Sequence, residues 1–257
     1  MSLTVRNLGF SYGARPVLAE VSFAARSGTL TAVLGPNGAG KTTLFRCILG
    51  LQPAYSGQIL LEGADLRTLS VREVAHRIAY IPQTHGIAFG YTALDMVLMG
   101  TAHTLRSVAV PGATETGRAL AALERLGVAH LKNQVYAQLS GGEQQLVLIA
   151  RALTQEAKTL LMDEPTSSLD YGNQARVLEV VRGLAAEGYT VLLSTHNPQH
   201  ALWYADVLLA LADGRVAAQG EPAALLDAAL LKRLYGIQAQ VLDTAQGPLI
   251  APERAGR

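Results

Sequence analysis

Residues 30–43 read LTAVLGPNGAGKTT, and this stretch decides the fold because an apolar segment runs directly into a glycine-rich turn. Positions 35–42 satisfy the pattern G-x-x-x-x-G-K-[ST] in full. Glycines let a backbone wrap closely around a polyphosphate, so that successive N–H groups point at its oxygens. A helix that begins near Lys41 adds the positive end of its dipole. The stretch therefore predicts a strand, a phosphate-binding turn and a helix, in that order.

Two side chains of the turn have their own chemical purpose. Lys41 would neutralise charge on the β- and γ-phosphates of a nucleotide, and the Thr42 hydroxyl would bind Mg²⁺. An ordinary glycine-rich turn between a strand and a helix needs neither group. The lysine and the hydroxyl therefore favour phosphate binding over a plain turn.

A second apolar strand, predicted at 160–162, ends in two adjacent carboxylates, Asp163 and Glu164. A buried strand would deliver Asp163 to the edge of the phosphate site, where it could hold Mg²⁺ directly or through water. Glu164 would point differently, because side chains alternate along a strand, and could polarise an attacking water as a general base. The pair alone is equally typical of a strand that enters a solvated acidic loop. The phosphate-binding motif about 120 residues upstream favours the catalytic interpretation.

The segment Leu139-Ser140-Gly141-Gly142-Glu143 opens an amphipathic helix. Ser140 and Glu143 form the S-x-x-E capping-box pattern, which is a sufficient structural reason for those two residues. Consecutive glycines weaken the first turn of a helix, by about 1 kcal/mol each relative to alanine. Gly141 and Gly142 are understandable if their amides closely approach an anion, such as a γ-phosphate presented by another subunit.

Composition excludes several classes of protein. Of the 257 residues, 49% are apolar and 16% charged, whereas a disordered chain shows the opposite balance. The 21 Lys and Arg against 20 Asp and Glu give a formal net charge of +1, without the basic surplus of an electrostatic nucleic-acid binder. The one cysteine, Cys47, fits a reducing compartment. We expect no secretory signal, and no membrane span because the apolar runs are far shorter than about 20 residues.

Strand and helix signals change along the chain. Residues 1–35 are predicted to form short strands, with a turn at 12–16, and 84–155 to form helices. Strand and helix alternate again from residue 160, which is typical of a parallel α/β sheet. Asp213-Gly214 marks the turn of a late hairpin over 207–218.

The domain organisation follows from these changes. We expect a main domain over 1–240, with a helical subdomain inserted at about 84–155, and a C-terminal extension over 241–257. The last ten residues are expected to fray. The helices predicted by periodicity lie at 91–99, 114–126, 141–153 and 174–186.

The motifs, taken in order, resemble those of the nucleotide-binding subunits of ABC transporters over nearly the whole chain. That family carries Walker A, a glutamine loop, an LSGGQ signature, Walker B, a D-loop and a switch histidine. The matching segments here are 35–43, Ile81-Pro82-Gln83, 139–143, 160–164, Ser167-Ser168-Leu169-Asp170 and Ser194-Thr195-His196. Glu143 stands where the family has glutamine, and Tyr12 sits where the family stacks an aromatic ring on adenine.

The resemblance implies a fold and an assembly. The fold is α/β, a P-loop NTPase parallel-sheet core with an N-terminal antiparallel β subdomain and an inserted helical subdomain. The assembly is a head-to-tail homodimer that binds two ATP molecules with Mg²⁺. Ser140, Gly141 and Gly142 of one copy would close over the γ-phosphate held by the other, and Asp170 would couple the two sites.

The resemblance also implies a role for each matched residue. Glu164 would be the catalytic base, His196 would sense the γ-phosphate, and Gln83 would contact Mg²⁺ or the lytic water. The implied Mg²⁺ ligands are Thr42, Gln83 and Asp163. The implied nucleotide contacts are Tyr12, Gly35, Pro36, Asn37, Gly38, Ala39, Gly40, Lys41, Thr42, Thr43, Ser140, Gly141, Gly142 and Asp170.

Within the family, the stretch 91–100 is similar to importers of metal chelates, the iron–siderophore, haem and vitamin B12 systems with molybdate-type relatives. The segments 234–237 and 240–242 look similar to the same group, although Thr101 stands where members often have arginine. This resemblance implies an ATPase at the cytoplasmic face of the bacterial inner membrane, bound peripherally. Its partners would be transmembrane permease subunits and, indirectly, a substrate-binding protein, with no nucleic acid.

Two other functions remain open at this point. A soluble ABC ATPase could act on nucleic acid or ribosomes, although the chain has neither a long coiled-coil insertion nor a second cassette. A non-catalytic nucleotide-binding regulator is disfavoured by the intact set of Lys41, Asp163, Glu164 and His196.

Overall fold

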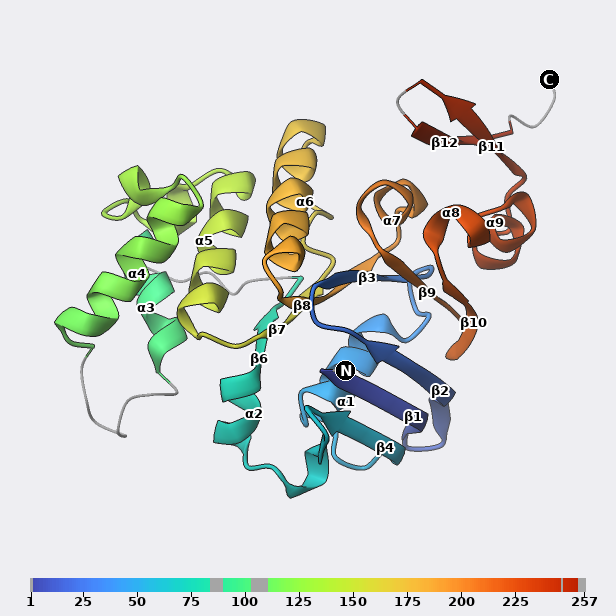
Figure 1. Ribbon diagram of the computed structural model, residues 1–257, viewed down its shortest axis with the longest axis horizontal. Coiled ribbons are helices and arrows are strands. Elements are labelled where there is room, and N and C mark those ends of the chain that lie inside the picture. Colours follow the sequence, from blue (N-terminus) through green and yellow to red (C-terminus); the bar gives the residue numbers. More distant parts are fainter. Residues whose placement is uncertain (1, 84–89, 103–110, 246, 254–257) are drawn as a thin grey trace.

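A six-stranded sheet forms the centre of the molecule in the computed structural model (Figure 1). The structure describes residues 2–83, 90–102, 111–245 and 247–253. In spatial order the strands are β10 (Arg215–Gly220), β9 (Val207–Ala212), β3 (Thr29–Leu34), β8 (Thr190–Thr195), β7 (Thr159–Asp163) and β6 (Ile78–Ile81). The pair β9–β10 is antiparallel and the other neighbouring pairs are parallel. Parallel strands present their carboxyl ends at one edge, so the turn after β3, the carboxylates of Asp163 and Glu164 at the end of β7, and His196 after β8 meet there.

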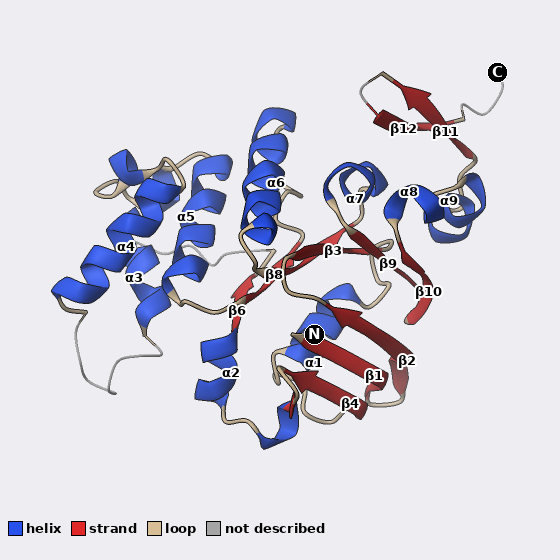
Figure 2. Ribbon diagram, viewed as in Figure 1, coloured by secondary structure: helices blue, strands red, loops and turns tan. Residues whose placement is uncertain are grey.

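The strands β7 and β8 are buried on both faces, so their alternate side chains enter two different hydrophobic cores. Leu161 and Leu192 pack with the first helix and the N-terminal strands. Leu160 and Leu193 pack with helices on the opposite face. The helices of these two layers are α1 (Lys41–Ile48) on the first face, and α5 (Gly141–Thr154) and α6 (Tyr171–Ala186) on the second (Figure 2). The strand ends are therefore held rigidly between two packed layers.

An antiparallel sheet at the N-terminus lies beside α1. Its order is β2-β1-β4-β5, with β1 (Leu3–Tyr12), β2 (Arg15–Ala25), β4 (Ser56–Leu61) and β5 (Ala64–Asp65). The turn expected at 12–16 is shorter, because pairing continues to Tyr12 opposite Arg15 and bulges absorb the irregular register. Both residues consequently lie at the tip of a hairpin.

Side-chain caps set where several helices begin. The helix expected at 91–99 is α3 (Ala93–Leu98), because Thr92 and Asp95 form a capping box at its start. The helix expected at 174–186 is α6, which starts three residues earlier because Asp170 caps it. The remaining helical elements of this half are η1 (Leu66–Thr68), α2 (Val71–Arg77), η2 (Met99–Thr101), α4 (Ala113–Arg125), η3 (Ala129–Leu131) and η4 (Tyr136–Gln138). Among the described residues, no helix combines the length and apolar character needed to cross a bilayer.

The C-terminal part contains more structure than the sequence predicted. The elements are α7 (Pro198–Tyr204), α8 (Pro222–Leu225), α9 (Ala228–Tyr235), β11 (Ala239–Thr244) and β12 (Gly247–Pro252). The expectation that the last ten residues fray is wrong for 248–252, which pair with β11. The expected hairpin over 207–218 forms as β9 and β10. The proposed domain boundary after residue 240 falls inside β11.

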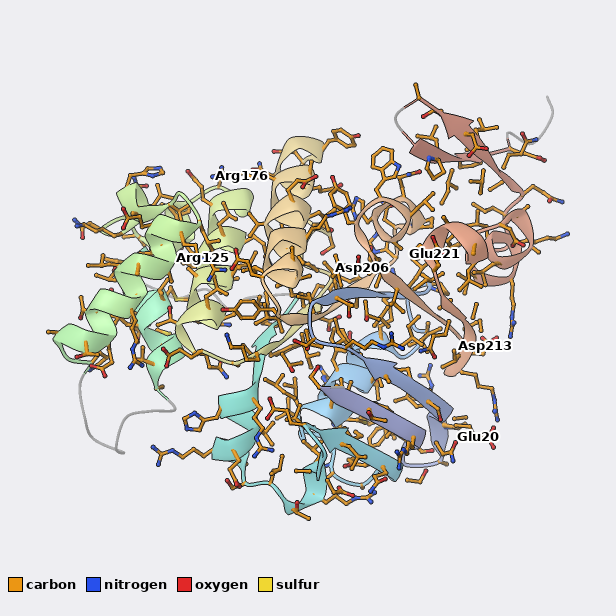
Figure 3. The ribbon with its side chains drawn as sticks, viewed as in Figure 1. Glu20, Arg125, Arg176, Asp206, Asp213 and Glu221 are labelled. Carbon is orange, nitrogen blue, oxygen red and sulfur yellow. The ribbon has the colours of Figure 1, made fainter. Side chains whose placement is uncertain are left out.

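Asp206 fixes the start of β9 against the start of β3 (Figure 3). Its Oδ2 accepts a hydrogen bond from the Leu30 amide at 2.8 Å, and its own amide donates to the Leu30 carbonyl at 2.9 Å. The carboxylate thus extends the pairing of β3, the strand that carries the phosphate-binding turn, by one further rung.

Candidate functional site

A polar cavity of about 680 Å³ opens at the carboxyl edge of the parallel strands. Its walls come from the β1–β2 hairpin tip, the turn before α1, the loop after β6 and the end of β7. The lining residues are Tyr12, Arg15, Val17, Asn37, Gly38, Gly40, Lys41, Thr42, Thr43, Gln83 and Glu164. Most of these were predicted, but Arg15 and Val17 were not, because no motif marks them.

The turn before α1 needs glycine at position 40. Gly40 has φ of 101°, and a Cβ there would lie 2.8 Å from the Leu18 side chain and 3.2 Å from the Val17 carbonyl oxygen. Both the left-handed backbone and the close approach of β2 exclude larger residues. The Lys41 ammonium folds back over the turn, where it donates to the carbonyls of Gly35 at 2.7 Å and Pro36 at 3.1 Å. The cation is thus held over the concave side of the turn.

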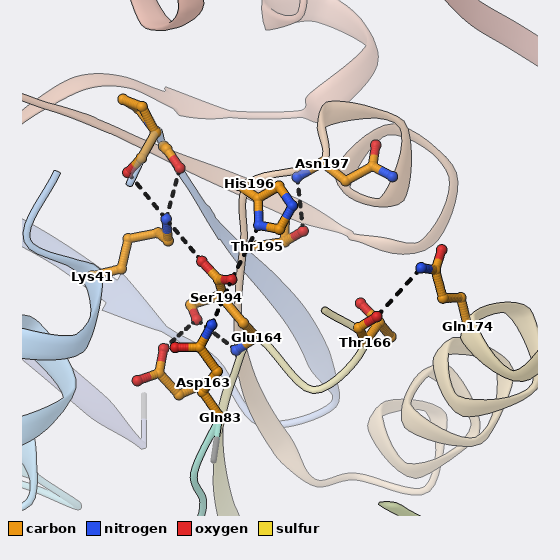
Figure 4. Close-up of polar contacts among 12 residues, drawn as sticks. Lys41, Gln83, Asp163, Glu164, Thr166, Gln174, Ser194, Thr195, His196 and Asn197 are labelled. Atoms are coloured by element: carbon orange, nitrogen blue, oxygen red, sulfur yellow. Dashed lines mark hydrogen bonds and ion pairs between the residues drawn. The ribbon is translucent and has the colours of Figure 1, made fainter. Parts of the chain in front are cut away.

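Glu164 joins the separate strand ends through its carboxylate (Figure 4). Its Oε1 lies 3.2 Å from the Lys41 Nζ, and the two side chains are only 9% and 5% exposed. Its Oε2 accepts from the Gln83 amide at 3.1 Å and lies 3.0 Å from the His196 Nδ1. The structure therefore brings three predicted site residues, Lys41, Gln83 and His196, to the carboxylate of a fourth.

Asp163 is held by two side chains from the neighbouring strands. Ser194 Oγ donates to its Oδ1 at 2.6 Å and accepts from the Glu164 amide at 2.9 Å. Tyr80 Oη donates to its Oδ2 at 3.3 Å. Burial and then the charge of Asp163 raise the pKa of Tyr80 to about 12, so the phenol remains a donor at neutral pH. Tyr80 was missed, since one tyrosine in an apolar strand has no sequence signature.

The donor set suits Mg²⁺ bound together with a polyphosphate rather than a resident metal. Asp163 is 1% exposed, which makes it a rigid buried carboxylate beside the cavity that Thr42 lines. Among the described residues, no group of three or more His, Cys, Asp and Glu could hold a metal ion alone. Mg²⁺ is typically bound through one or two carboxylates, with phosphate oxygens and water among its remaining ligands. The residues present fit that mode of binding.

The predicted signature residues do not line this cavity. Ser140 caps α5, with its amide donating to Glu143 Oε2 at 2.9 Å and its hydroxyl 2.6 Å from the same oxygen. These hydrogen bonds lower the pKa of Glu143. Gly141 lines a separate pocket with Gln83 and Glu164. Ser140, Gly141 and Gly142 are thus absent from the lining of the cavity at the glycine-rich turn of their own chain.

Two of the predicted site residues, Gly142 and Asp170, have local structural roles that the sequence did not show. A Cβ at Gly142 would come within 2.2 Å of the Asn173 side-chain oxygen, so close packing on α6 requires glycine there. Asp170 Oδ1 accepts from the Asn173 amide at 2.8 Å, and hydrogen bonds of this kind lower its pKa. The reason given above for Gly142, approach to an anion, is therefore not the only physical reason for it.

Tyr12 projects its ring at the hairpin tip beside the cavity. The side chain is 42% exposed, and the ring meets Phe10 edge-to-face with centroids 4.9 Å apart. An edge contact leaves a ring face free. That face is available to stack on a planar base.

Known proteins resemble this chain over almost its whole length. Residues 18–167 match the family model described as ABC transporter. The hemin import ATP-binding protein HmuV of Bordetella bronchiseptica is 41% identical over 265 residues, covering 99% of this chain and 100% of that protein. A probable iron chelatin transport ATP-binding protein of Helicobacter pylori is 38% identical, covering 91% and 93%. A solved metal-chelate type ABC transporter, in an inward-facing conformation, has a TM-score of 0.86 at 33% identity, covering 98% of each chain.

Replacing Ser194 with alanine tests the network around Asp163. The change leaves the buried Glu164 amide without its acceptor and Asp163 without its shorter hydrogen bond. An unsatisfied buried group costs about 1–3 kcal/mol, so we expect Ser194→Ala to lower the free energy of unfolding by about 2 kcal/mol. Urea unfolding without nucleotide measures it, with Ser11→Ala on the exposed side of β1 as the control. A loss no larger than that of the control would contradict the network.

Proposed function

Because this chain belongs to the ABC transporter family of ATP-binding proteins, we propose that it is the ATP-hydrolysing subunit of a bacterial metal-chelate importer. The substrate class is an iron–siderophore, haem or cobalamin complex. ATP hydrolysis is supported by the contacts of Glu164 with Lys41, Gln83 and His196, beside the phosphate-binding turn. The names of its relatives, hemin import and iron chelatin transport, support the substrate class.

Entry of ATP would exchange the partners of Lys41. The ammonium now lies on two carbonyls and on Glu164, at the end of the cavity bounded by the turn. Phosphate oxygens offer a stronger charge-assisted partner in the same place, so the ammonium would turn to them. The Glu164 carboxylate would then be released from its ion pair and be free to contact the attacking water. Substrate binding would thereby activate the base.

The residues around Glu164 have distinct roles in this proposal. Glu164 takes a proton from the attacking water, while Gln83 and His196, already within hydrogen-bond distance of it, orient that water and the γ-phosphate. Thr42, Gln83 and Asp163 are the residues that would hold Mg²⁺. When bound, Mg²⁺ supplies positive charge to the phosphate oxygens.

A second copy of the chain would complete the site. Ser140, Gly141 and Gly142 do not line their own cavity, and Ser140 and Gly141 are exposed at the start of α5. In a head-to-tail homodimer the amides at this helix start would face the γ-phosphate bound by the partner. Asp170, exposed at the start of α6, would lie between the two sites. Hydrolysis would remove the bridging charge and release the two copies from each other.

An apolar groove supports docking on a membrane permease. It has a volume of about 360 Å³ between α2, η2 and α5, and Tyr80, one of its lining residues, donates a hydrogen bond to Asp163. Leu51, Val71 and Met99 along it are 64%, 88% and 42% exposed. Exposed apolar side chains gathered along a groove mark an interaction site. Docking there would hold the subunit at the cytoplasmic face of the membrane, and a substrate-binding protein would join indirectly.

A soluble ABC ATPase acting on nucleic acid or ribosomes is not favoured. The named relatives above are import and transport proteins, and the net charge of +1 provides no basic surplus. Phosphate contacts dominate nucleic-acid affinity and require such a surplus.

Changing Glu164 to glutamine tests the base. We expect Glu164→Gln to bind a non-hydrolysable ATP analogue at least as tightly as the native chain. In this variant Lys41 does not have to break an ion pair with a carboxylate before it contacts the phosphates. Phosphate release should fall by about 100-fold or more, since general-base catalysis contributes about 10²–10⁴-fold. Calorimetry and a phosphate-release assay measure the two effects, with Glu221→Gln, at an exposed position before α8, as control. Near-native turnover would remove Glu164 from the role of base.

The docking groove is tested by a charge at its rim. Val71 is the first residue of α2, where an acidic side chain suits the helix dipole, so Val71→Asp should fold normally. We expect this variant to retain ATPase activity within about two-fold but to lose co-purification with the permease from detergent-solubilised membranes. Leu242→Asp, at an exposed apolar position on β11, is the control. Undiminished co-purification of Val71→Asp would place the docking surface elsewhere.

A further inference from the structure

The switch histidine lies on a short connection whose backbone determines its reach. His196 follows β8 and precedes α7, and its side chain is half exposed. The imidazole Nδ1 contacts Glu164 Oε2 at 3.0 Å. An exposed ring does not hold its own position by packing. Its placement against Glu164 therefore depends on what fixes the main chain of residues 195–199.

Tyr235, at the end of α9, binds that main chain directly. Its Oη donates to the His196 carbonyl at 2.9 Å, across 39 residues of sequence. Burial and then the negative charge of Glu164 raise the pKa of Tyr235, so its hydroxyl remains protonated at neutral pH. A donor from the C-terminal region thus holds the peptide group of the switch residue.

Gln199, in the first turn of α7, fastens the same segment to β12. Its Nε2 donates to the Pro248 carbonyl at 3.1 Å, and its Oε1 accepts from the Ile250 amide at 2.8 Å. The side-chain amide thus satisfies both a donor and an acceptor of the strand. The backbone N–H of Gln199 donates to Asn197 Oδ1 at 2.9 Å, and the backbone N–H of Asn197 donates to Thr195 Oγ1 at 3.0 Å. Hydrogen bonds therefore continue from β12 to the end of β8.

Apolar packing joins α7, α9 and the hairpin into one unit. Trp203 on α7 donates from its indole to the Pro248 carbonyl at 2.8 Å. Leu230, Leu231 and Leu234 of α9 share a hydrophobic cluster with Ala201 of α7, against which Ile250 of β12 packs. Figure 1 shows the hairpin beside α9, with β12 on the side toward α7. A shift of the hairpin would therefore move α7 and the connection that carries His196.

We propose that Tyr235 and Gln199 are positioning residues, through which α9 and the β11–β12 hairpin set the reach of His196 toward the γ-phosphate. The inference rests on the proposed function because ATP hydrolysis is what it controls. Packing alone would not require these hydrogen bonds. Tyr235 of α9 donates to the main chain of His196, and the Gln199 side chain on α7 pairs with the main chain of β12. The strand β12, in a segment that the sequence predicted to fray, thereby helps to position His196.

The phenylalanine variant of Tyr235 separates this role from packing. Tyr235→Phe keeps the ring and removes only the hydrogen bond to His196. We expect kcat for ATP hydrolysis to fall by about three- to ten-fold, the range that one lost hydrogen bond produces, while KM changes by less than about two-fold. Hydrogen–deuterium exchange of residues 195–204 should rise, with the exchange of α1 unchanged. Tyr204→Phe, on α7, is the matched control and should do none of this.

The decisive comparison is the effect of Tyr235→Phe on the rate of hydrolysis with His196 present and with His196 replaced. If Tyr235 acts through His196, then Tyr235→Phe has no further effect on the rate in a His196→Gln background, because the two changes are not independent. Single-turnover hydrolysis of radiolabelled ATP measures the residual rates. Gln199→Met, which keeps the length and removes both polar atoms, should repeat the loss of kcat.

The outcomes separate the inference from the function on which it rests. No hydrolysis by the native chain would overturn the proposed function. A native chain that hydrolyses ATP, together with an unchanged kcat in Tyr235→Phe, would overturn the inference alone. An equal loss in Tyr204→Phe, or the same loss with and without His196, would also overturn it.

Discussion

The ion pair between Lys41 and Glu164 is the contact on which the site depends. Its nitrogen and oxygen lie 3.2 Å apart with both side chains nearly inaccessible to water. Burying two charges is costly unless hydrogen bonds satisfy the rest of each group. The carbonyls of Gly35 and Pro36 do this for the ammonium, and Gln83 and His196 do it for the carboxylate. Removing either partner would leave an uncompensated charge in the sheet edge.

The pair also explains how substrate entry can prepare the chemistry. A triphosphate brings several negative oxygens to the turn, and the lysine is already folded over that turn. Transfer of the cation from carboxylate to phosphate neutralises the substrate and frees the base in one movement. The parallel sheet makes this possible because it holds the turn after β3 and the end of β7 at fixed separation. Two tyrosines connect this centre with other parts of the molecule. Tyr80, which lines the docking groove, donates to Asp163, and Tyr235 in the C-terminal part donates to the His196 carbonyl.

The site residues that could be predicted are those that belong to a sequence motif and also lie at the end of a recognisable strand. Lys41, Asp163 and Glu164 follow apolar strands that the sequence marks clearly, and the parallel sheet joins their ends. Tyr80 and Arg15 could not be found this way, because strand pairing and a hairpin tip bring them to the site.

The C-terminal extension shows the same limit more strongly. The strand β12 is built around Pro248 and Ile250, whose main chain pairs with β11 and with the side chain of Gln199. The contact with Gln199 spans about 50 residues of sequence and leaves no periodic pattern in a short, proline-containing segment.

Calorimetry of Mg²⁺ with a non-hydrolysable ATP analogue on Lys41→Ala and on the native chain tests the central claim, with the exposed Lys158→Ala as reference. The account predicts binding by the native and reference proteins and a loss of about ten-fold or more in Lys41→Ala, since a hydrogen bond to a charged group is worth about 1.5–3 kcal/mol. Equal affinity in all three proteins would contradict it.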